Sequence, residues 1–173
     1  MQIQVGELQV NIDIVGYQFP EATEVWDANW LNIRVQLRLA DGRVWERTDP
    51  CMEVQEAQRL ASWLDEVGRH AALFVGWQHE TLHSDVMFTE PCLSFSARSP
   101  WFHGSERRDF LFFRVIMSNE LVPPFADELA HLAEEDGQIS EAWLDCPLDQ
   151  EALAVCAAEW RTQLTQFPPR GTP

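Results

Sequence analysis

The chain has 173 residues, of which 46% are hydrophobic, enough for a single domain spanning residues 1–173 with a buried core. Its formal net charge is −16, and all 12 basic residues are arginine. Nucleic acid and anionic membranes attract positive charge, so this composition excludes both as favoured partners. A basic protein is the kind of partner that suits such a charge.

The N-terminal sequence and the cysteines favour a cytoplasmic protein. The first ten residues lack the basic and apolar regions of a secretory signal. The longest uninterrupted apolar stretch, residues 71–77, is far shorter than the roughly 20 residues that cross a bilayer. Cys51, Cys92, Cys146 and Cys156 are far apart and form no CxxC pair. We therefore expect free buried thiols rather than a disulfide framework or a zinc site.

Three N-terminal segments alternate between apolar and polar residues with the period of two that is typical of half-buried strands. They are Leu8–Ile14, Leu31–Leu39 and Arg43–Thr48. Asp41 and Gly42 lie between the second and the third segment, and this dipeptide predicts a hairpin with a type I′ turn. In that register Arg38 faces Trp45 across the hairpin as a cation–π pair.

Two helices are predicted from apolar spacing and from their end signals. The first starts with Asp49 as N-cap and Pro50 at the first helical position, and it ends at Gly68. The second runs from about Asp149 to Gln166. Three further strands are predicted between them, at residues 93–97, 110–117 and 140–146.

These elements do not alternate as the strands and helices of a parallel α/β sheet do. Their order predicts an α+β fold, in which two α-helices pack on a mainly antiparallel, twisted β-sheet or sandwich. Residues 69–84 follow no clear pattern.

Acidic residues concentrate in the last third of the chain. Residues 120–159 contain eleven carboxylates and no Lys or Arg. If the even-numbered residues of the strand at 140–146 face the core, Glu141, Trp143 and Asp145 share its outer face. A tryptophan between carboxylates is typical of an interface with a basic partner. The alternative is that the terminal helix covers this face and that Trp143 belongs to the core.

A second acidic cluster lies beside a short predicted helical stretch that ends at Gly137. It is either part of the same partner-binding surface or an ordinary solvated face. Its members are Asp127, Glu128, Glu134, Glu135 and Asp136.

The segment HETLH matches the zinc-binding pattern HExxH. On a helix, His79 and His83 would hold Zn²⁺ while Glu80 activates water. The candidates for the third ligand of a catalytic zinc are His103 and Glu106, beyond a further strand. The alternative is a solvated helix turn without metal. Because the chain also lacks a Gly-rich phosphate loop and a nucleophile elbow, we expect no enzymatic activity and no cofactor.

Several short motifs occur in a fixed order along nearly the whole chain. Between about residues 8 and 170 they are Gly16-Tyr17-Gln18-Phe19-Pro20, Trp26-Asp27-Ala28-Asn29-Trp30-Leu31, Thr48-Asp49-Pro50-Cys51, Phe88-Thr89-Glu90-Pro91 with Leu93-Ser94-Phe95, and Phe167-Pro168-Pro169-Arg170. In these motifs the chain resembles the WapI-type immunity protein family, small bacterial proteins named for neutralising the tRNA-nuclease tip of a contact-dependent toxin. The resemblance implies core positions for Trp26 and Trp30, a helix start at Asp49-Pro50 and a helix terminus at Phe167. It implies no catalytic residue.

Charge and resemblance together lead to the hypothesis of an acidic cytosolic protein that covers a basic nuclease toxin and performs no chemistry itself. Two alternatives stay open. One is a metal-dependent hydrolase that uses His79 and His83, and the other is an acidic protein-interaction module of another pathway. A metal assay separates the hydrolase from the rest, and a toxin gene beside this gene separates the immunity protein from the module.

Overall fold

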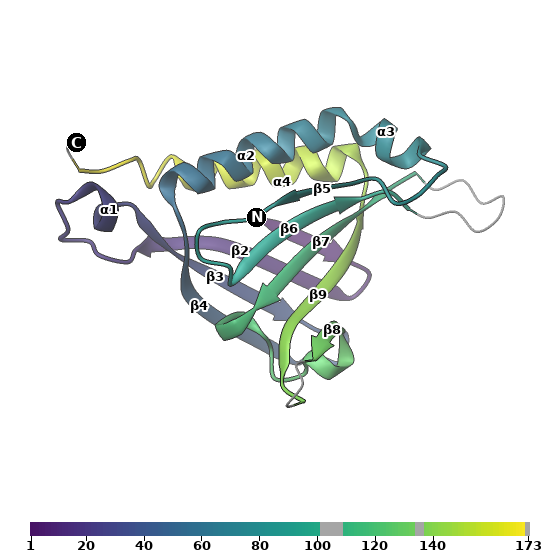
Figure 1. Ribbon diagram of the computed structural model, residues 1–173, viewed down its shortest axis with the longest axis horizontal. Helices are drawn as coiled ribbons and strands as arrows, with labels where there is room; N and C mark the ends of the chain where they lie inside the picture. Colours follow the sequence, from purple (N-terminus) through teal and green to yellow (C-terminus); the bar gives the residue numbers. More distant parts are fainter. Residues whose placement is uncertain (101–108, 134–136, 172–173) are drawn as a thin grey trace.

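The computed structural model describes residues 1–100, 109–133 and 137–171. Within these ranges the strands form two antiparallel sheets that share one core (Figure 1). The first sheet has the strand order β1-β2-β3-β4, and the second has the order β5-β6-β7-β9-β8. The strands are β1 (Gln2–Val5), β2 (Leu8–Tyr17), β3 (Trp30–Arg38), β4 (Val44–Glu53), β5 (His83–Val86), β6 (Leu93–Arg98), β7 (Leu111–Ser118), β8 (Ala130–Ala133) and β9 (Ile139–Leu148).

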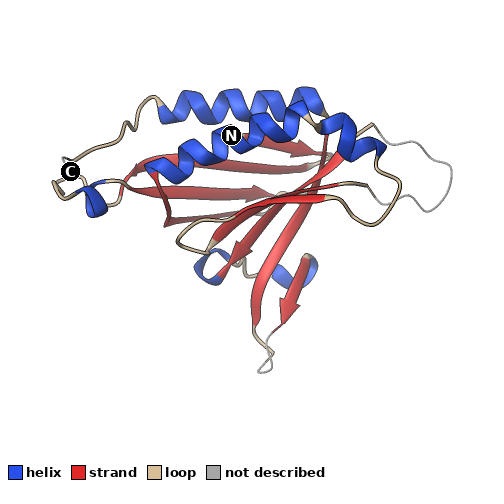
Figure 2. Cartoon of the chain, turned by 45° about the horizontal axis from the view of Figure 1, so that its top comes forward, coloured by secondary structure: helices blue, strands red, loops and turns tan. Residues whose placement is uncertain are grey.

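Two long helices, α2 and α4, lie side by side along the top of the sheets (Figures 1 and 2). The other helical segments are short and lie at the ends of strands or helices. The bounds are α1 (Val25–Ala28), α2 (Val54–Arg69), α3 (Ala71–Gly76) and α4 (Gln150–Leu164), with 3₁₀ turns η1 (Asn119–Leu121) and η2 (Ala126–Glu128). Two antiparallel sheets with two packed helices confirm the predicted α+β class.

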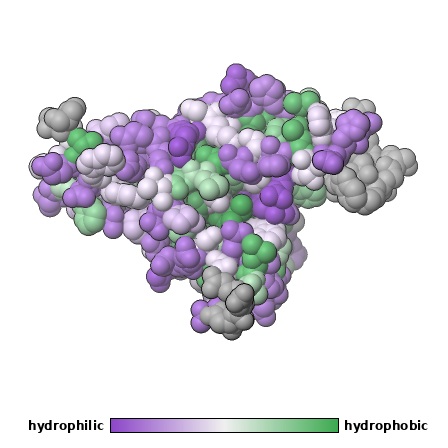
Figure 3. All heavy atoms as spheres, viewed as in Figure 1, coloured by the Kyte–Doolittle hydropathy of each residue, from purple (hydrophilic) through white to green (hydrophobic). Residues whose placement is uncertain are grey.

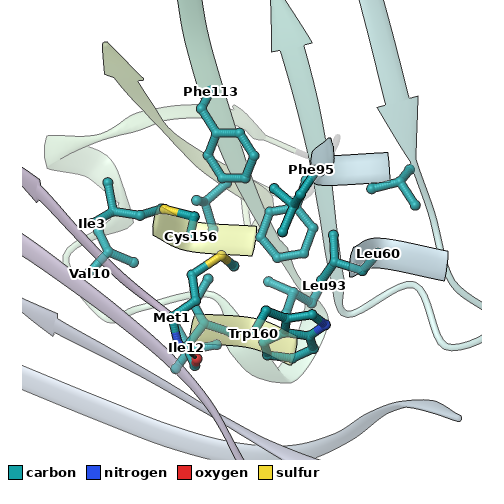
Figure 4. Close-up of a cluster of buried hydrophobic side chains, with 14 of the residues drawn as sticks. Met1, Ile3, Val10, Ile12, Leu60, Leu93, Phe95, Phe113, Cys156 and Trp160 are labelled. Carbon is teal, nitrogen blue, oxygen red and sulfur yellow. Dashed lines mark hydrogen bonds between the residues drawn. The ribbon is translucent and has the colours of Figure 1, made fainter. Parts of the chain in front are cut away.

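The core lies where both sheets meet the helix pair. Trp160 of α4 is fully buried, and its Nε1 donates a 2.8 Å hydrogen bond to the carbonyl oxygen of Ala57 in α2. Figure 4 shows Ile12 from the first sheet and Phe95 and Phe113 from the second gathered around this helix pair. The two phenylalanine rings stack with their centroids 5.6 Å apart. The apolar residues that alternate along these predicted strands therefore pack into one shared core.

All four cysteines are buried and carry free thiols, as predicted. Burial raises the pKa of Cys146 to about 12 and that of Cys156 to about 11. A hydrogen bond with Cys92, followed by burial, also raises the pKa of Cys51. A raised pKa keeps a cysteine in the thiol form at neutral pH, whereas the thiolate is the nucleophile, so Cys51, Cys146 and Cys156 have the properties of structural rather than catalytic cysteines.

The hairpin between β3 and β4 exists, but its turn differs from the predicted type I′. That turn needs positive φ at both central residues, and here Gly42 has φ +88° whereas Asp41 is not in the left-handed region. The Leu39 backbone N–H donates to the Arg43 carbonyl, so the connection has three residues rather than two. The extra residue shifts the register, and Leu37 rather than Arg38 lies opposite Trp45. The predicted Arg38–Trp45 pair is therefore wrong.

The first long helix starts later than predicted. Asp49 and Pro50 belong to β4, and the helix begins at Val54 with Glu53 as its N-cap. β4 is the edge strand of its sheet, where proline is tolerated because it need not donate to a neighbouring strand. Gly68 lies inside α2, one residue before its end. The predicted helix start at Asp49-Pro50 is wrong, and Gly68, predicted to terminate the helix, lies within it, with His70 as the C-cap.

The positions that the family resemblance implies are only partly correct. Trp26 is 77% exposed, so its predicted place in the core is wrong. Trp30 is half-buried at the start of β3. Phe167 lies three residues beyond the end of α4 and packs edge-on against the ring of Tyr17, at a centroid distance of 5.6 Å. Across the three described ranges, no helix has both the length and the apolar character that a bilayer span requires.

Candidate partner-binding face

Strand β9 has the alternation that the sequence predicts. Ala142, Leu144 and Cys146 are buried in the core. Because successive side chains of a strand point to opposite faces, Glu141, Trp143 and Asp145 lie on the outer face of the second sheet. We call the outer face of β7, β8 and β9 the β9 face. The candidate trio is therefore brought together on one surface, as predicted.

Trp143 fits neither of the two environments proposed for it. It is half-buried, and Cζ of Arg114 lies 4.7 Å from its ring centroid. Arg114 comes from the neighbouring strand β7, where it pairs in register with Asp145. Its guanidinium donates to both carboxylate oxygens of Asp145, with Nε to Oδ1 at 2.6 Å and Nη2 to Oδ2 at 2.7 Å. The indole is thus held in place by a cation–π contact, and the charge of Asp145 is compensated.

The surroundings of Trp143 on the β9 face are more apolar than its sequence neighbours suggest. The strand register places Ile116 of β7 and Ala130 of β8 beside it. Leu132 of β8 lies opposite Glu141 and is 56% exposed. Figure 3 shows this side of the molecule, with hydrophobic residues gathered over the second sheet and hydrophilic residues around them.

An arginine also compensates one acid of the second cluster. Arg43, from the β3–β4 turn, donates to Glu128 of η2 from Nη1 at 2.8 Å and from Nη2 at 2.6 Å. Its Nε donates to Asp41 at 2.6 Å, and its Cζ lies 5.3 Å from the ring centroid of Phe125. The guanidinium hydrogen bonds lower the pKa of Glu128. The pKa of Asp41 is lowered first by a 2.9 Å hydrogen bond from the Arg43 backbone N–H and then by the guanidinium. We call this arrangement the Arg43 clamp; it joins the first sheet to the edge of the β9 face.

Two acidic residues of the predicted partner-binding site have no cationic partner in the described part of the chain. Asp127 is exposed and forms no ion pair there. Glu141 is half-buried, and its only described polar contact is a 3.5 Å hydrogen bond from the Ser118 hydroxyl. The predicted short helical stretch is η2 followed by strand β8, so the expectation of one helix ending at Gly137 is wrong. Glu134, Glu135 and Asp136 lie outside the described residues.

A pocket of 310 Å³ opens beside the Arg43 clamp. Its walls are mainly apolar, and they come from both sheets and from the segment around η2. They include Leu8, Leu39, Phe125, Leu129 and Leu144, with Glu128 at the rim. This volume is large enough for a partner side chain to enter.

The acidic segment 120–159 does not form one surface. Its η2 and β8 parts lie at the lower end of the molecule in Figure 1, β9 runs upward from that end, and α4 lies at the top. In the α4 region, Asp149 accepts a 2.8 Å hydrogen bond from the Ala152 backbone and caps the helix. Glu159 accepts one of 2.8 Å from the Gln2 backbone. These two carboxylates stabilise the fold through backbone hydrogen bonds, Asp149 at the junction of β9 with α4 and Glu159 within α4.

The HETLH segment does not have the geometry that a zinc peptidase needs. Residues 77–82 form no helix, and His83 begins strand β5, so the predicted helix turn is wrong. His83 Nε2 lies 3.5 Å from Asp85 Oδ2, and the His79 ring packs edge-on against Trp77 at 5.8 Å. In the described ranges, no three His, Cys, Asp or Glu side chains are grouped for a metal ion. His103 and Glu106 lie outside the described residues.

Sequence reasoning missed the two arginines that shape this site. Arg114 is the one charged residue in the predicted strand 110–117. A single charge among apolar residues is the sequence feature that could have identified it. A charge on a central strand is expected to have an opposite charge on the adjacent strand. Identifying that partner as Asp145 required the pairing of β7 with β9, which periodicity does not supply.

Comparisons with known proteins agree with the family resemblance. The family model described as "Immunity protein WapI-like family" matches residues 2–168. No curated protein matches the chain. The crystal structure of WHY1 from Arabidopsis thaliana is similar at 13% identity and a TM-score of 0.41, over 96% of this chain and 83% of that one. WHY3 from the same plant gives 14% identity and a TM-score of 0.37, over 96% and 86%. Both similarities are too weak to indicate a shared function.

Proposed function

This chain belongs to the Immunity protein WapI-like family, and from that membership we propose that it neutralises a basic nuclease toxin in the cytoplasm by covering the surface that binds RNA. Toxin neutralisation is the function that the family as a whole supports. The nuclease activity of the target, its basic surface and the cytoplasmic location are the proposed part. Neutralisation by occlusion requires no catalytic residue and no cofactor of the inhibitor.

The observation that carries the proposal is the family match over residues 2–168, nearly the whole chain. The net charge of −16 supports a basic target, because a nuclease that grips RNA needs positive charge at its substrate site. Opposite charges raise the association rate toward roughly 10⁸–10⁹ M⁻¹s⁻¹ at low salt. Fast association suits an inhibitor that must reach the toxin before the toxin reaches its substrate.

We propose the β9 face as the surface that meets the toxin. Trp143 is its central anchor, since an amphipathic ring held by Arg114 loses little freedom on binding. Leu132 adds exposed apolar surface beside it. Asp127 and Glu141 supply negative charge without a described counter-ion, and Glu128 and Asp145 contribute through their arginine partners. Glu134, Glu135 and Asp136 belong to the same proposal through their place in the sequence, between β8 and β9.

The test uses the toxin domain encoded by the gene beside this one. Co-expression with the parent protein should restore growth of cells that produce the toxin domain, and surface-immobilised kinetics should show direct binding. Replacing both Glu134 and Glu135 by lysine should slow association and weaken its salt dependence. The control is Glu66→Lys, which changes an exposed charge on α2, at the top of the molecule in Figure 1. Failure of the parent protein to bind the toxin domain would falsify the proposal.

A further inference from the structure

The segment around α1 presents the most exposed large hydrophobic side chain among the described residues. Trp26 is 77% exposed, although tryptophan usually buries most of its surface. Phe19, earlier in the same segment, is 43% exposed. We call residues 18–29 the α1 lobe. Figures 1 and 2 show it at one end of the molecule beside the C-terminal segment, away from β8 and β9.

The exposure of Trp26 is not the result of a loosely attached lobe. Asn29 is buried, and its side chain donates to the carbonyl oxygens of Val25 at 2.8 Å and Arg170 at 2.9 Å. It also accepts a 2.8 Å hydrogen bond from the Arg170 backbone. The Arg170 guanidinium lies over the Tyr17 ring at 4.4 Å and donates to the Pro20 carbonyl. Hydrogen bonds within the lobe and to Arg170 of the C-terminal segment therefore hold the lobe in place.

The residue after Arg170 also packs closely against the lobe. Gly171 has φ +85°, and a Cβ atom at this position would lie only 3.0 Å from Val25 Cα. Only glycine combines this backbone conformation with such a close approach. A tryptophan displayed on a lobe with this many internal bonds is preorganised, and binding through it costs little ordering entropy.

The charges around Trp26 indicate what it meets. Glu21, Glu24 and Asp27 are all exposed, and none forms an ion pair with a residue in the described ranges. Arg170, the nearby cation, is engaged with Tyr17 and with backbone carbonyls. An indole face flanked by free carboxylates favours a lysine or arginine side chain, which gains a cation–π contact and an ion pair together. A second copy of this chain is disfavoured, because both copies carry a charge of −16.

We propose that the α1 lobe is a second contact surface for the toxin, with Trp26 receiving a lysine or arginine side chain of that basic protein. The proposal rests on the proposed function, because it assigns a second anchor to the same partner. The exposed tryptophan between carboxylates that the sequence predicts at Trp143 is in fact found at Trp26.

The experiment measures binding of the adjacent gene's toxin domain to the full chain and to single variants. Trp26→Ala should raise Kd about 30-fold, mainly through a faster off-rate, as truncation of a hot-spot residue does. Trp26→Phe should restore part of the affinity, because a phenyl ring also accepts a cation. Glu24→Lys should slow association. The matched control is Met87→Ala, since Met87 is 69% exposed but lies beside β5 rather than in the lobe.

The possible outcomes separate the two proposals. If the parent protein does not bind the toxin domain, the proposed function fails and this inference fails with it. If the parent protein binds and Trp26→Ala and Glu24→Lys bind equally well, only the lobe inference is overturned. If Trp26→Ala weakens binding no more than Met87→Ala does, the effect is not specific to the lobe and the inference is again overturned. Equal melting temperatures of parent and variants establish that each comparison is made between folded proteins.

Discussion

The outer faces of the two sheets are built differently. On the first sheet, polar side chains pair with one another across the strands. Asn11 donates to Gln36 at 3.0 Å, and Gln36 donates in turn to Glu46 at 2.8 Å. Arg34 donates to Asp13 at 2.9 Å. These cross-strand pairs use most of their polar atoms within the face, although Nε of Arg34 is buried without a hydrogen-bond partner. Polar side chains paired in this way across strands are typical of a face that is exposed to water.

On the second sheet, the β9 face combines one arginine–carboxylate pair with apolar side chains. Trp143 and Ile116 lie side by side in the strand register, and Leu132 is more than half exposed. Apolar groups gathered on one face, with few polar pairs around them, are typical of contact surfaces. Sequence charge alone does not locate the interface, because both faces carry acidic residues. The two exposed valines of the first sheet, Val15 and Val44, lie toward opposite ends of their strands, whereas the apolar side chains of the β9 face gather around Trp143.

The largest effect is expected from Trp143→Ala. Truncating the anchor should cost at least ~2 kcal/mol of toxin-binding free energy, mainly as a faster off-rate. Gln36→Ala, at the middle of the first sheet's outer face, should leave the kinetics unchanged. Surface-immobilised kinetics on both variants test the difference between the faces. If the two variants lost equal amounts of binding free energy, or if neither lost any, the proposed difference between the two faces would be wrong.

Gly42→Val should cost about 1–2 kcal/mol of unfolding free energy, measured by urea titration. Valine is forced to the positive φ of +88° that Gly42 adopts, which a β-branched side chain strongly disfavours. Gly42→Asn should cost less, because asparagine tolerates the left-handed region. This turn holds Arg43 beside Glu128, so the variant also weakens the connection between the first sheet and the β9 face. An unchanged urea midpoint in the valine variant would contradict the described turn.

Substitutions in the Arg43 clamp should change the association rate in opposite directions. Arg43→Gln releases the charges of Asp41 and Glu128 and should speed association with a basic toxin a few-fold at low salt. Glu128→Gln should slow it. Both effects should shrink as salt rises, because the groups are exposed. Stopped-flow measurements of the association rate at two salt concentrations test this prediction. If both variants changed the association rate in the same direction, the clamp would not be part of the interface.

The smallest effect concerns Asp49 in β4, a residue that points to the inner side of the first sheet opposite Ile33. Burial, and then the charge of Glu120, raise the pKa of Asp49. A carboxyl whose folded pKa is raised destabilises the protein progressively as pH rises from its ordinary value through the folded pKa. Asp49→Asn should therefore stabilise the protein slightly at pH 7, and the difference should vanish near pH 3. Thermal melts across this range test the sign, and a loss of stability at pH 7 would contradict it.

The parts of the fold that periodicity could predict are the long strands and α4. β9 alternates cleanly, and Asp149 accepts the hydrogen bond expected of an N-cap. The strands β1, β5 and β8 were not predicted, because four residues are too few to show a period. Asp49-Pro50 was misread since the same dipeptide suits a helix start and the edge strand where it actually lies.

The candidate site was predictable only in part. The shared face of Glu141, Trp143 and Asp145 follows from the period of two. Their compensation by Arg114 does not, because it depends on which strand pairs with β9. The exposure of Trp26 contradicts the usual preference of tryptophan for the core, and the carboxylates beside it in the sequence, Glu24 and Asp27, are the local signal of that exposure.

Hydroxyl-radical footprinting of the protein, with and without the toxin domain, tests the central claim most directly, because it reports the solvent exposure of individual side chains. The account predicts that the toxin lowers oxidation of Trp143 and Leu132 on the β9 face. Oxidation of Met87 beside β5 and of Val155 on α4, both exposed in the free protein, should stay unchanged. Unchanged oxidation of Trp143 and Leu132 together with protection of Met87 or Val155 would contradict it.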